Sequence, residues 1–137
     1  AEAGHRIGNH THRHPHLSKL SADAVKVEIE KAERLIAPYQ GPGSKLFRPP
    51  YGDRNRTVDS IVRKLGYRLV MWTVDTKDWR SENQPPGWME YGIRQMRWRK
   101  RCVILNHDIQ TTAQNLDEFI RSIIALGNVS FQSPWTL

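Results

Sequence analysis

The stretch that decides the fold covers residues 67–79 and reads YRLVMWTVDTKDW. Its first eight residues are mostly apolar or aromatic, which is typical of a buried β-strand, and a polar turn follows at once. The same order recurs at residues 46–51 and 102–108. In parallel α/β folds, the loops after the carboxyl ends of the strands carry the chemistry. The sequence therefore predicts an α/β fold whose functional residues follow its strands.

Helical patterns separate these strands, as alternating βα units require. After Ser21, which can cap a helix, apolar residues recur every three or four positions. Thr57 can cap a second helix, which Gly66 would end. The expected helices cover residues 21–37, 58–65, 89–98 and 112–126, and the expected strands cover residues 46–48, 67–74, 102–105 and 129–131.

Length and composition restrict the class of protein further. The 137 residues bound the chain to one domain, and no apolar stretch approaches the ~18 residues of a membrane span. Cys102 is the only cysteine, which excludes an internal disulfide and a cysteine metal site. The net charge of +7 is compatible with anionic partners: nucleic acid, anionic lipid or an acidic wall polymer.

Five of the six histidines lie within residues 5–16. His10 and His14 are four positions apart, so on one helical turn or in a tight loop their rings can converge on one ion. Neutral imidazole suits zinc, cobalt or nickel. The alternative is a solvated histidine cluster.

A second candidate segment covers residues 47–52. Arg48 can hold a carboxylate in a bidentate pair, and the backbone N–H of Tyr51 can stabilise an oxyanion. The alternative is a rigid turn, fixed by Pro49 and Pro50, in which Arg48 makes a structural salt bridge.

Two further segments contain groups that can transfer or orient protons. Asp75 and Asp78 are candidates for orienting an acid or a base, and the alternative is a capped loop with solvated carboxylates. His107 directly follows a predicted buried strand, where an imidazole can act as general acid or can be a satisfied core histidine.

Residues 94–101 interleave five basic residues with Trp98. Such a run can bind nucleic acid. We favour the alternative, a solvated helix end with Trp98 packed inward.

In this order, four segments resemble motifs of the polysaccharide deacetylase family, the NodB-homology carbohydrate esterases. The family's His-Ser/Thr-x-x-His motif resembles residues 10–14, and Arg-x-Pro-Tyr resembles residues 48–51. Asp-x-x-Asp-Trp resembles residues 75–79, and Leu-x-His resembles residues 105–107. These enzymes use a divalent metal to remove acetyl groups from chitin, peptidoglycan or xylan.

The resemblance implies a partial (β/α) barrel of the distorted, TIM-like deacetylase type. The family's first motif, Thr-Phe-Asp-Asp, does not occur in this sequence. In the family it supplies the catalytic base and the third protein ligand of the metal. We therefore expect residues 1–137 to be a single incomplete domain that lacks the N-terminal strand or strands. A missing N-terminal segment or a second chain would complete the barrel.

The resemblance also implies a role for each matched residue. His10 and His14 would bind the metal, with zinc expected first and cobalt, nickel or manganese as alternatives. Arg48 would orient the base, and the Tyr51 N–H would hold the oxyanion.

In the later motifs, Asp78 would orient His107, the general acid. The resemblance places four further residues at the substrate: Trp79, Leu105, Pro50 and Asp75.

The function that the resemblance implies is a metal-dependent hydrolase that removes acetyl groups from an N-acetylated polysaccharide, peptidoglycan or chitin. Such an enzyme would be secreted, periplasmic or in the cell envelope, and this chain alone would be inactive without the catalytic Asp. The alternatives are a non-catalytic, glycan-binding pseudo-deacetylase and, less favoured, a basic nucleic-acid-binding module.

Overall fold

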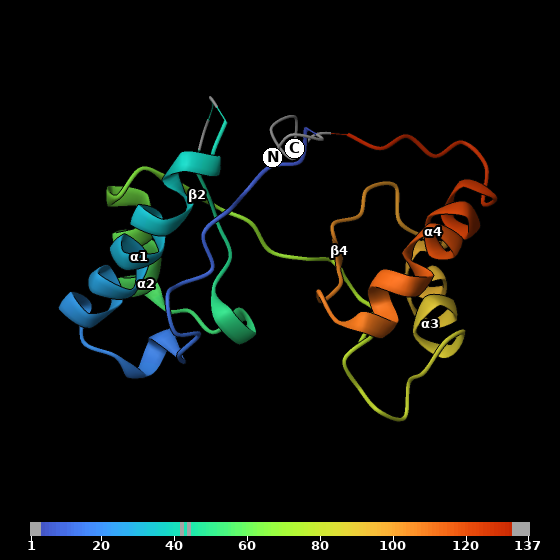
Figure 1. Cartoon of the computed structure of the whole chain (residues 1–137), viewed down its shortest axis with the longest axis horizontal. Coiled ribbons are helices and arrows are strands. Elements are labelled where there is room, and N and C mark those ends of the chain that lie inside the picture. The colour runs from blue at the N-terminus through green and yellow to red at the C-terminus, as the bar shows by residue number, and fades with distance from the viewer. Residues whose placement is uncertain (1–3, 42, 44, 133–137) are drawn as a thin grey trace. The chain divides into compact units, whose positions relative to one another are not determined.

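The computed structural model describes residues 4–41, 43 and 45–132. The chain divides into two compact units, Ala1–Met71 and Trp72–Leu137, each of which is described by itself. Helices alternate with short strands along the chain (Figure 1). The pairs of hydrogen-bonded strands are parallel in both units, which confirms the α/β class. In the described residues they form two separate two-stranded sheets, so closure into a barrel stays a prediction.

In the first unit, β1 (Lys45–Phe47) pairs in parallel with β2 (Tyr67–Leu69). Asn9 extends this arrangement through a parallel bridge to Phe47. Along the first unit the Asn9 bridge, a helix, β1, a second helix and β2 follow one another, which is the expected alternation of strands and helices. The carboxyl ends of these segments lead directly into the histidine loop and the Arg48 turn.

Two helices pack beside these strands, as Figure 1 shows for α1 (Ala22–Ile36) and α2 (Arg56–Lys64). Ser21 caps α1 as predicted, because its hydroxyl accepts a hydrogen bond from the Ala24 N–H. The predicted cap of the next helix was wrong, since the Asn55 side chain caps α2 from two positions before Thr57. The buried core of the unit contains Leu17, Val25, Ile29, Phe47, Val58, Val62 and Tyr67.

In the second unit, β3 (Val74–Asp75) pairs in parallel with β4 (Ile104–Leu105). Its helices are α3 (Gly87–Met96) and α4 (Gln110–Ile124). Gly92 lets α3 pack closely against α4, since a Cβ atom at position 92 would lie only 3.1 Å from the Phe119 ring. The core contains Val74, Trp88, Met89, Met96, Phe119 and Ile123.

Two predicted strands differ from the structure. The single strand expected over residues 67–74 is interrupted, because β2 ends at Leu69 and β3 begins at Val74. No strand forms at residues 129–131, where Val129 and Phe131 are exposed. Periodicity alone cannot show where strand pairing stops, because pairing depends on a partner that is distant in sequence.

The exposure of several apolar side chains also departs from the prediction. The apolar residues of α4 predict one inward face that includes Leu116, Phe119, Ile123 and Ile124. Leu116 and Ile124 are exposed, whereas Phe119 and Ile123 are buried. Trp98, expected to pack inward, is 88% exposed. Within the described residues, no helix is both long enough and apolar enough to cross a membrane.

Candidate active-site residues

The histidine pair lies in the loop after Asn9. The Nε2 atoms of His10 and His14 face one another at 3.2 Å, and the two rings meet edge to face. Nδ1 of His10 lies 2.5 Å from the carbonyl oxygen of Arg48, which can only accept a hydrogen bond. Nδ1 therefore carries a proton, so in the neutral form of the ring Nε2 presents a lone pair toward His14.

This spacing can be compared with that of two ligands of one metal ion. Donor atoms about 2.1 Å from a tetrahedral ion lie about 3.4 Å from each other. The observed 3.2 Å between the Nε2 atoms of His10 and His14 is close to that value. Among the described residues, no group of three or more His, Cys, Asp or Glu side chains is placed to hold a metal. The pair thus fits part of a ligand set.

The histidine loop requires an unusual backbone. Thr11 and His14 have left-handed φ values of 69° and 58°, which are costly for residues other than glycine. Asn9, which is buried, supports this shape because its Oδ1 accepts the Thr11 N–H at 2.9 Å. Its Nδ2 bonds the Ile29 carbonyl and the Tyr67 hydroxyl, each at 2.9 Å. The loop is thereby anchored to α1 and β2.

An ion pair between the exposed Arg13 and the buried Glu28 also anchors this loop. Glu28 of α1 is only 1% exposed and accepts hydrogen bonds of 2.8 Å from both the N–H and the Nε of Arg13. Burial by itself raises the pKa of Glu28. The hydrogen bonds and the positive charge of Arg13 outweigh that effect and lower its pKa.

Because the pKa of Glu28 is lowered on folding, its ionised form stabilises the native state. That contribution is complete above the unfolded-state pKa, near 4.3, and is lost as the pH falls through the lower folded-state value. We expect Glu28→Gln to cost about 1–2 kcal/mol at pH 7. The difference from the wild type should shrink below about pH 4. Urea unfolding followed by circular dichroism at pH 7 and pH 3 measures both values.

Glu118→Gln is the matched control, because Glu118 is exposed on α4. It should leave the free energy of unfolding nearly unchanged at both pH values. Equal losses for the two variants at pH 7 would contradict a specific role of the Glu28 carboxylate.

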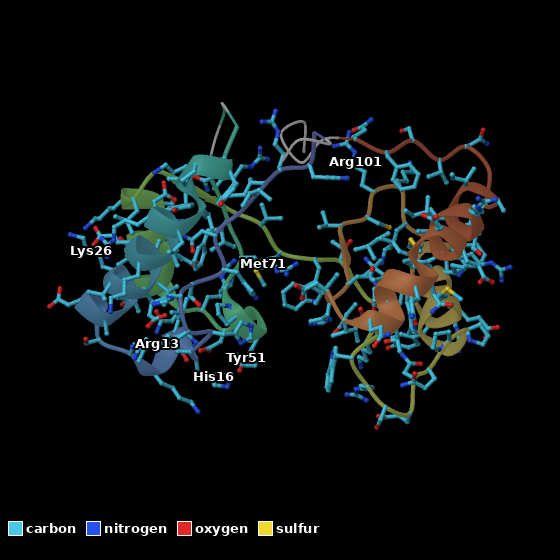
Figure 2. All side chains as sticks on the ribbon, viewed as in Figure 1. Arg13, His16, Lys26, Tyr51, Met71 and Arg101 are labelled. Carbon is cyan, nitrogen blue, oxygen red and sulfur yellow. The ribbon has the colours of Figure 1, made fainter. Side chains whose placement is uncertain are left out.

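Tyr51 lies beside the histidine pair. Its φ of 58° is left-handed, and the turn is closed by a 3.1 Å hydrogen bond from the Gly52 N–H to the Pro49 carbonyl. The exposed Tyr51 ring stacks on His16 at 4.2 Å and meets His14 edge to face at 4.6 Å. Figure 2 labels Tyr51 and His16 in this cluster. The structure therefore brings the predicted oxyanion turn and metal loop together.

Arg48 connects the same two segments through its backbone. Its N–H donates to the Asn9 carbonyl at 3.0 Å, and its own carbonyl holds the His10 ring. Burial lowers the pKa of the half-buried Arg48 guanidinium. No carboxylate of the described residues forms an ion pair with it. This guanidinium is thus a position where a carboxylate would be stabilised.

In the second unit, Asp78 and His107 form a hydrogen-bonded pair. Asp78 is 2% exposed, and its Oδ1 lies 2.8 Å from Nδ1 of His107. Its Oδ2 accepts the His107 N–H at 2.7 Å and the Thr112 hydroxyl at 2.6 Å. Burial raises the pKa of Asp78, but these hydrogen bonds and the charge of His107 together lower it. Asp78 therefore stays ionised and fixes the imidazole with Nδ1 as donor.

This pairing leaves the second ring nitrogen of His107 for chemistry. The side chain is 37% exposed, whereas Asp78 is covered. With Nδ1 held by a carboxylate, Nε2 is the atom that can give or take a proton. The structure thus brings Asp78 and His107 together, and the role of His107 as general acid stays a prediction.

The four residues predicted at the substrate differ in exposure and contacts. Trp79 is exposed, and the Arg80 guanidinium lies 5.2 Å from its ring centroid. Leu105 and Pro50 are buried. Asp75 uses its Oδ1 to accept the Lys77 N–H at 3.0 Å, which shapes the loop that leads to Asp78. A role for any of them in binding substrate stays a prediction.

The sequence reasoning missed three residues that position the candidate groups. Asn9 supports the histidine loop, Glu28 holds Arg13, and Thr112 donates to Asp78. One of them had a detectable signal, because Glu28 lies three positions after Val25 on the apolar stripe of its helix. A carboxylate on such a stripe indicates a buried, paired charge. Thr112 was predicted to begin a helix, whereas α4 begins two residues earlier, at Gln110.

Comparison with known proteins identifies the class. The chain has parallel βα units with a histidine pair and a carboxylate–histidine pair after its strands, as metal-assisted hydrolases of the α/β class can have. The family model described as polysaccharide deacetylase matches residues 1–70, half of the chain. The chain belongs to this family.

Individual relatives agree with this assignment. The chain is 38% identical over 81 residues to a peptidoglycan-N-acetylglucosamine deacetylase of Bacillus cereus, covering 59% of this chain and 30% of the relative. It is 33% identical over 134 residues to the uncharacterized protein YlxY of Bacillus subtilis, covering 95% of this chain and 41% of YlxY. The chain thus spans less than half the length of either curated relative.

A solved structure is similar over most of the chain. The crystal structure of BA3943 of Bacillus anthracis, described as a CE4 family pseudoenzyme, superposes with a TM-score of 0.82 and 28% identity. The match covers 92% of this chain and 44% of BA3943. The α/β arrangement of this chain is therefore that of part of a CE4 family protein.

Proposed function

We propose that this chain is part of a metal-dependent hydrolase that removes acetyl groups from an N-acetylated polysaccharide of the peptidoglycan or chitin type. The observation that carries the proposal is the 3.2 Å approach of Nε2 of His10 to Nε2 of His14, with Nδ1 of His10 held by a carbonyl. One divalent ion would take a lone pair from each Nε2, in place of the hydrogen bond that the two nitrogens can otherwise share.

His10 and His14 would hold a divalent ion, with zinc the best match to a nitrogen donor set. When bound, such an ion polarises an acetyl carbonyl and makes a water molecule more acidic. The backbone N–H of Tyr51, aimed by the left-handed turn, would donate to the acetyl oxygen as negative charge develops on it.

His107 would supply the proton that the leaving amine needs. Asp78 holds Nδ1–H, so Nε2 is the donor to the amine nitrogen as the C–N bond breaks. The ionised Asp78 also stabilises the imidazolium before transfer. Trp79, Leu105, Pro50 and Asp75 are proposed to contact the substrate.

The catalytic base would come from a further segment of polypeptide. Catalytic zinc sites have three protein ligands, and the described residues contain no such group. The Arg48 guanidinium has no carboxylate partner among those residues and would orient an incoming Asp. We propose that residues 1–137 form an incomplete domain, completed as a (β/α) barrel by an N-terminal segment or a second chain.

The proposed location is outside the cytoplasm or in the cell envelope. The relative from Bacillus cereus is named for a peptidoglycan substrate, which is a wall polymer. The charge of +7 suits an anionic envelope.

A non-catalytic, glycan-binding protein is the second candidate. The similarity to BA3943, described as a pseudoenzyme, favours it. The incomplete ligand set of the described residues is also compatible with it.

Acetate release from the full-length protein separates the two candidates. On acetylated chitooligosaccharides and peptidoglycan fragments, we expect acetate production that falls at least about tenfold after chelation and returns with added zinc. Release that is indifferent to the chelator would contradict the metal-dependent proposal. Binding of the same oligosaccharides without acetate release at any metal concentration would favour the pseudoenzyme.

A further inference from the structure

The loop that follows α3 carries a concentrated positive charge. Residues 97–101, named here the basic tip, contain four cations and no acidic residue, and therefore hold four of the seven net positive charges of the chain. All five side chains are exposed. Figure 2 labels Arg101 at the end of the tip. A partner of this surface must carry negative charge.

Trp98 lies between these basic residues in the sequence. Its side chain is 88% exposed, more than any other large hydrophobic side chain of the described residues. The Arg99 Nε donates to the Gln95 carbonyl at 3.1 Å, which ties the tip to the end of α3. The basic tip therefore exposes an indole ring and charged groups to solvent and is held to α3 by this hydrogen bond.

We propose that the basic tip binds the surface of an anionic phospholipid bilayer. Tryptophan is enriched at membrane interfaces, where its apolar ring and its N–H are both satisfied. Each Lys or Arg close to an anionic leaflet increases partitioning about fivefold. Four such residues give a preference of between two and three orders of magnitude for anionic over zwitterionic lipid.

The exposure of Trp98 favours a bilayer over other anionic partners. Proteins that bind single-stranded nucleic acid place aromatic rings in a groove, whose walls cover part of each ring. A ring that is 88% exposed has almost no protein beside it. A neutral glycan would leave the four cations unpaired. A flat lipid surface can accept both the protruding ring and the surrounding charges.

This surface is separate from the proposed hydrolytic function, and binding to vesicles tests it directly. The full chain is sedimented with vesicles of phosphatidylcholine alone or with about one-third phosphatidylglycerol. We expect binding only to the anionic vesicles. Arg97→Gln/Arg99→Gln should weaken it by about 25-fold, and Trp98→Ala by about tenfold.

Two matched control variants remove cations or an aromatic ring from residues outside the basic tip. Lys31→Gln/Arg34→Gln removes two exposed cations of α1, and Phe131→Ala removes another exposed aromatic ring. Because neither variant alters the basic tip, both should bind within about twofold of the wild type. Acetate release from the full-length protein should be the same with all these substitutions, which separates this outcome from that of the proposed hydrolase.

Four outcomes would overturn the proposal. They are absence of binding to any vesicle, equal binding to phosphatidylcholine alone, and equal losses in the matched variants. The fourth is preferential binding to a single-stranded oligonucleotide that Trp98→Ala weakens, which would assign the tip to nucleic acid instead.

Discussion

Replacing His107 by alanine should lower kcat for acetate release by about 10²–10⁴-fold in the full-length protein. The expected loss is large because an amine is a poor leaving group until its nitrogen is protonated. In the structure, Asp78 holds Nδ1 of His107 at 2.8 Å, so Nε2 is the atom placed to transfer that proton. Initial rates on acetylated chitooligosaccharide measure the effect.

Two further variants show whether the loss is chemical. Asp78→Asn removes the negative charge but keeps a side chain of the same shape, so it should lower kcat less than His107→Ala. His5→Ala removes another exposed histidine and should leave kcat unchanged. If His107→Ala retains more than about half of the wild-type rate and an intact circular dichroism spectrum, His107 is not the general acid.

Replacing either His10 or His14 by alanine should reduce affinity for zinc by about 100-fold or more. The two Nε2 atoms are 3.2 Å apart, so each single variant leaves one imidazole, which cannot form a chelate. Isothermal titration with zinc gives the dissociation constants. The visible absorption of bound cobalt reports the coordination geometry independently of activity.

His12→Ala is a stringent control for these variants. His12 lies in the same loop, between the two candidate ligands, and is exposed. Its replacement should change the affinity for zinc less than about twofold, whereas replacement of His10 or His14 should lower it by about 100-fold or more. Equal losses for His10, His12 and His14 would instead describe a solvated histidine cluster.

Much of the fold could be predicted from sequence because its signals are local. Apolar spacing and a serine cap located α1 to within one residue at each end. Strand ends were harder to predict, since the chain interrupts pairing between Leu69 and Val74. Hydrogen bonding there depends on segments elsewhere in the chain, which side-chain periodicity does not describe.

The candidate functional residues could be predicted from the sequence, but the residues that hold them in place could not. Spacing predicted the pair of His10 with His14, and the family resemblance implied the pair of Asp78 with His107. The structure brings each pair together. Asn9 accepts a hydrogen bond from the histidine loop, and Thr112 donates one to Asp78. Asparagine and threonine are common in turns and helix caps, so neither residue stands out in the sequence. Only burial distinguishes them from surface residues.

The sequence alone determined the family, the alternation of helices and strands, and the identity of the candidate ligands and acid, because these depend on residue type and short spacing. Tertiary structure decided which nitrogen of His10 faces His14, since Nδ1 is held by the carbonyl of Arg48, 38 positions away. It also decided that Glu28 is buried and that Trp98 is exposed. Burial and tautomer depend on which distant segments pack together, and local sequence patterns do not specify that packing.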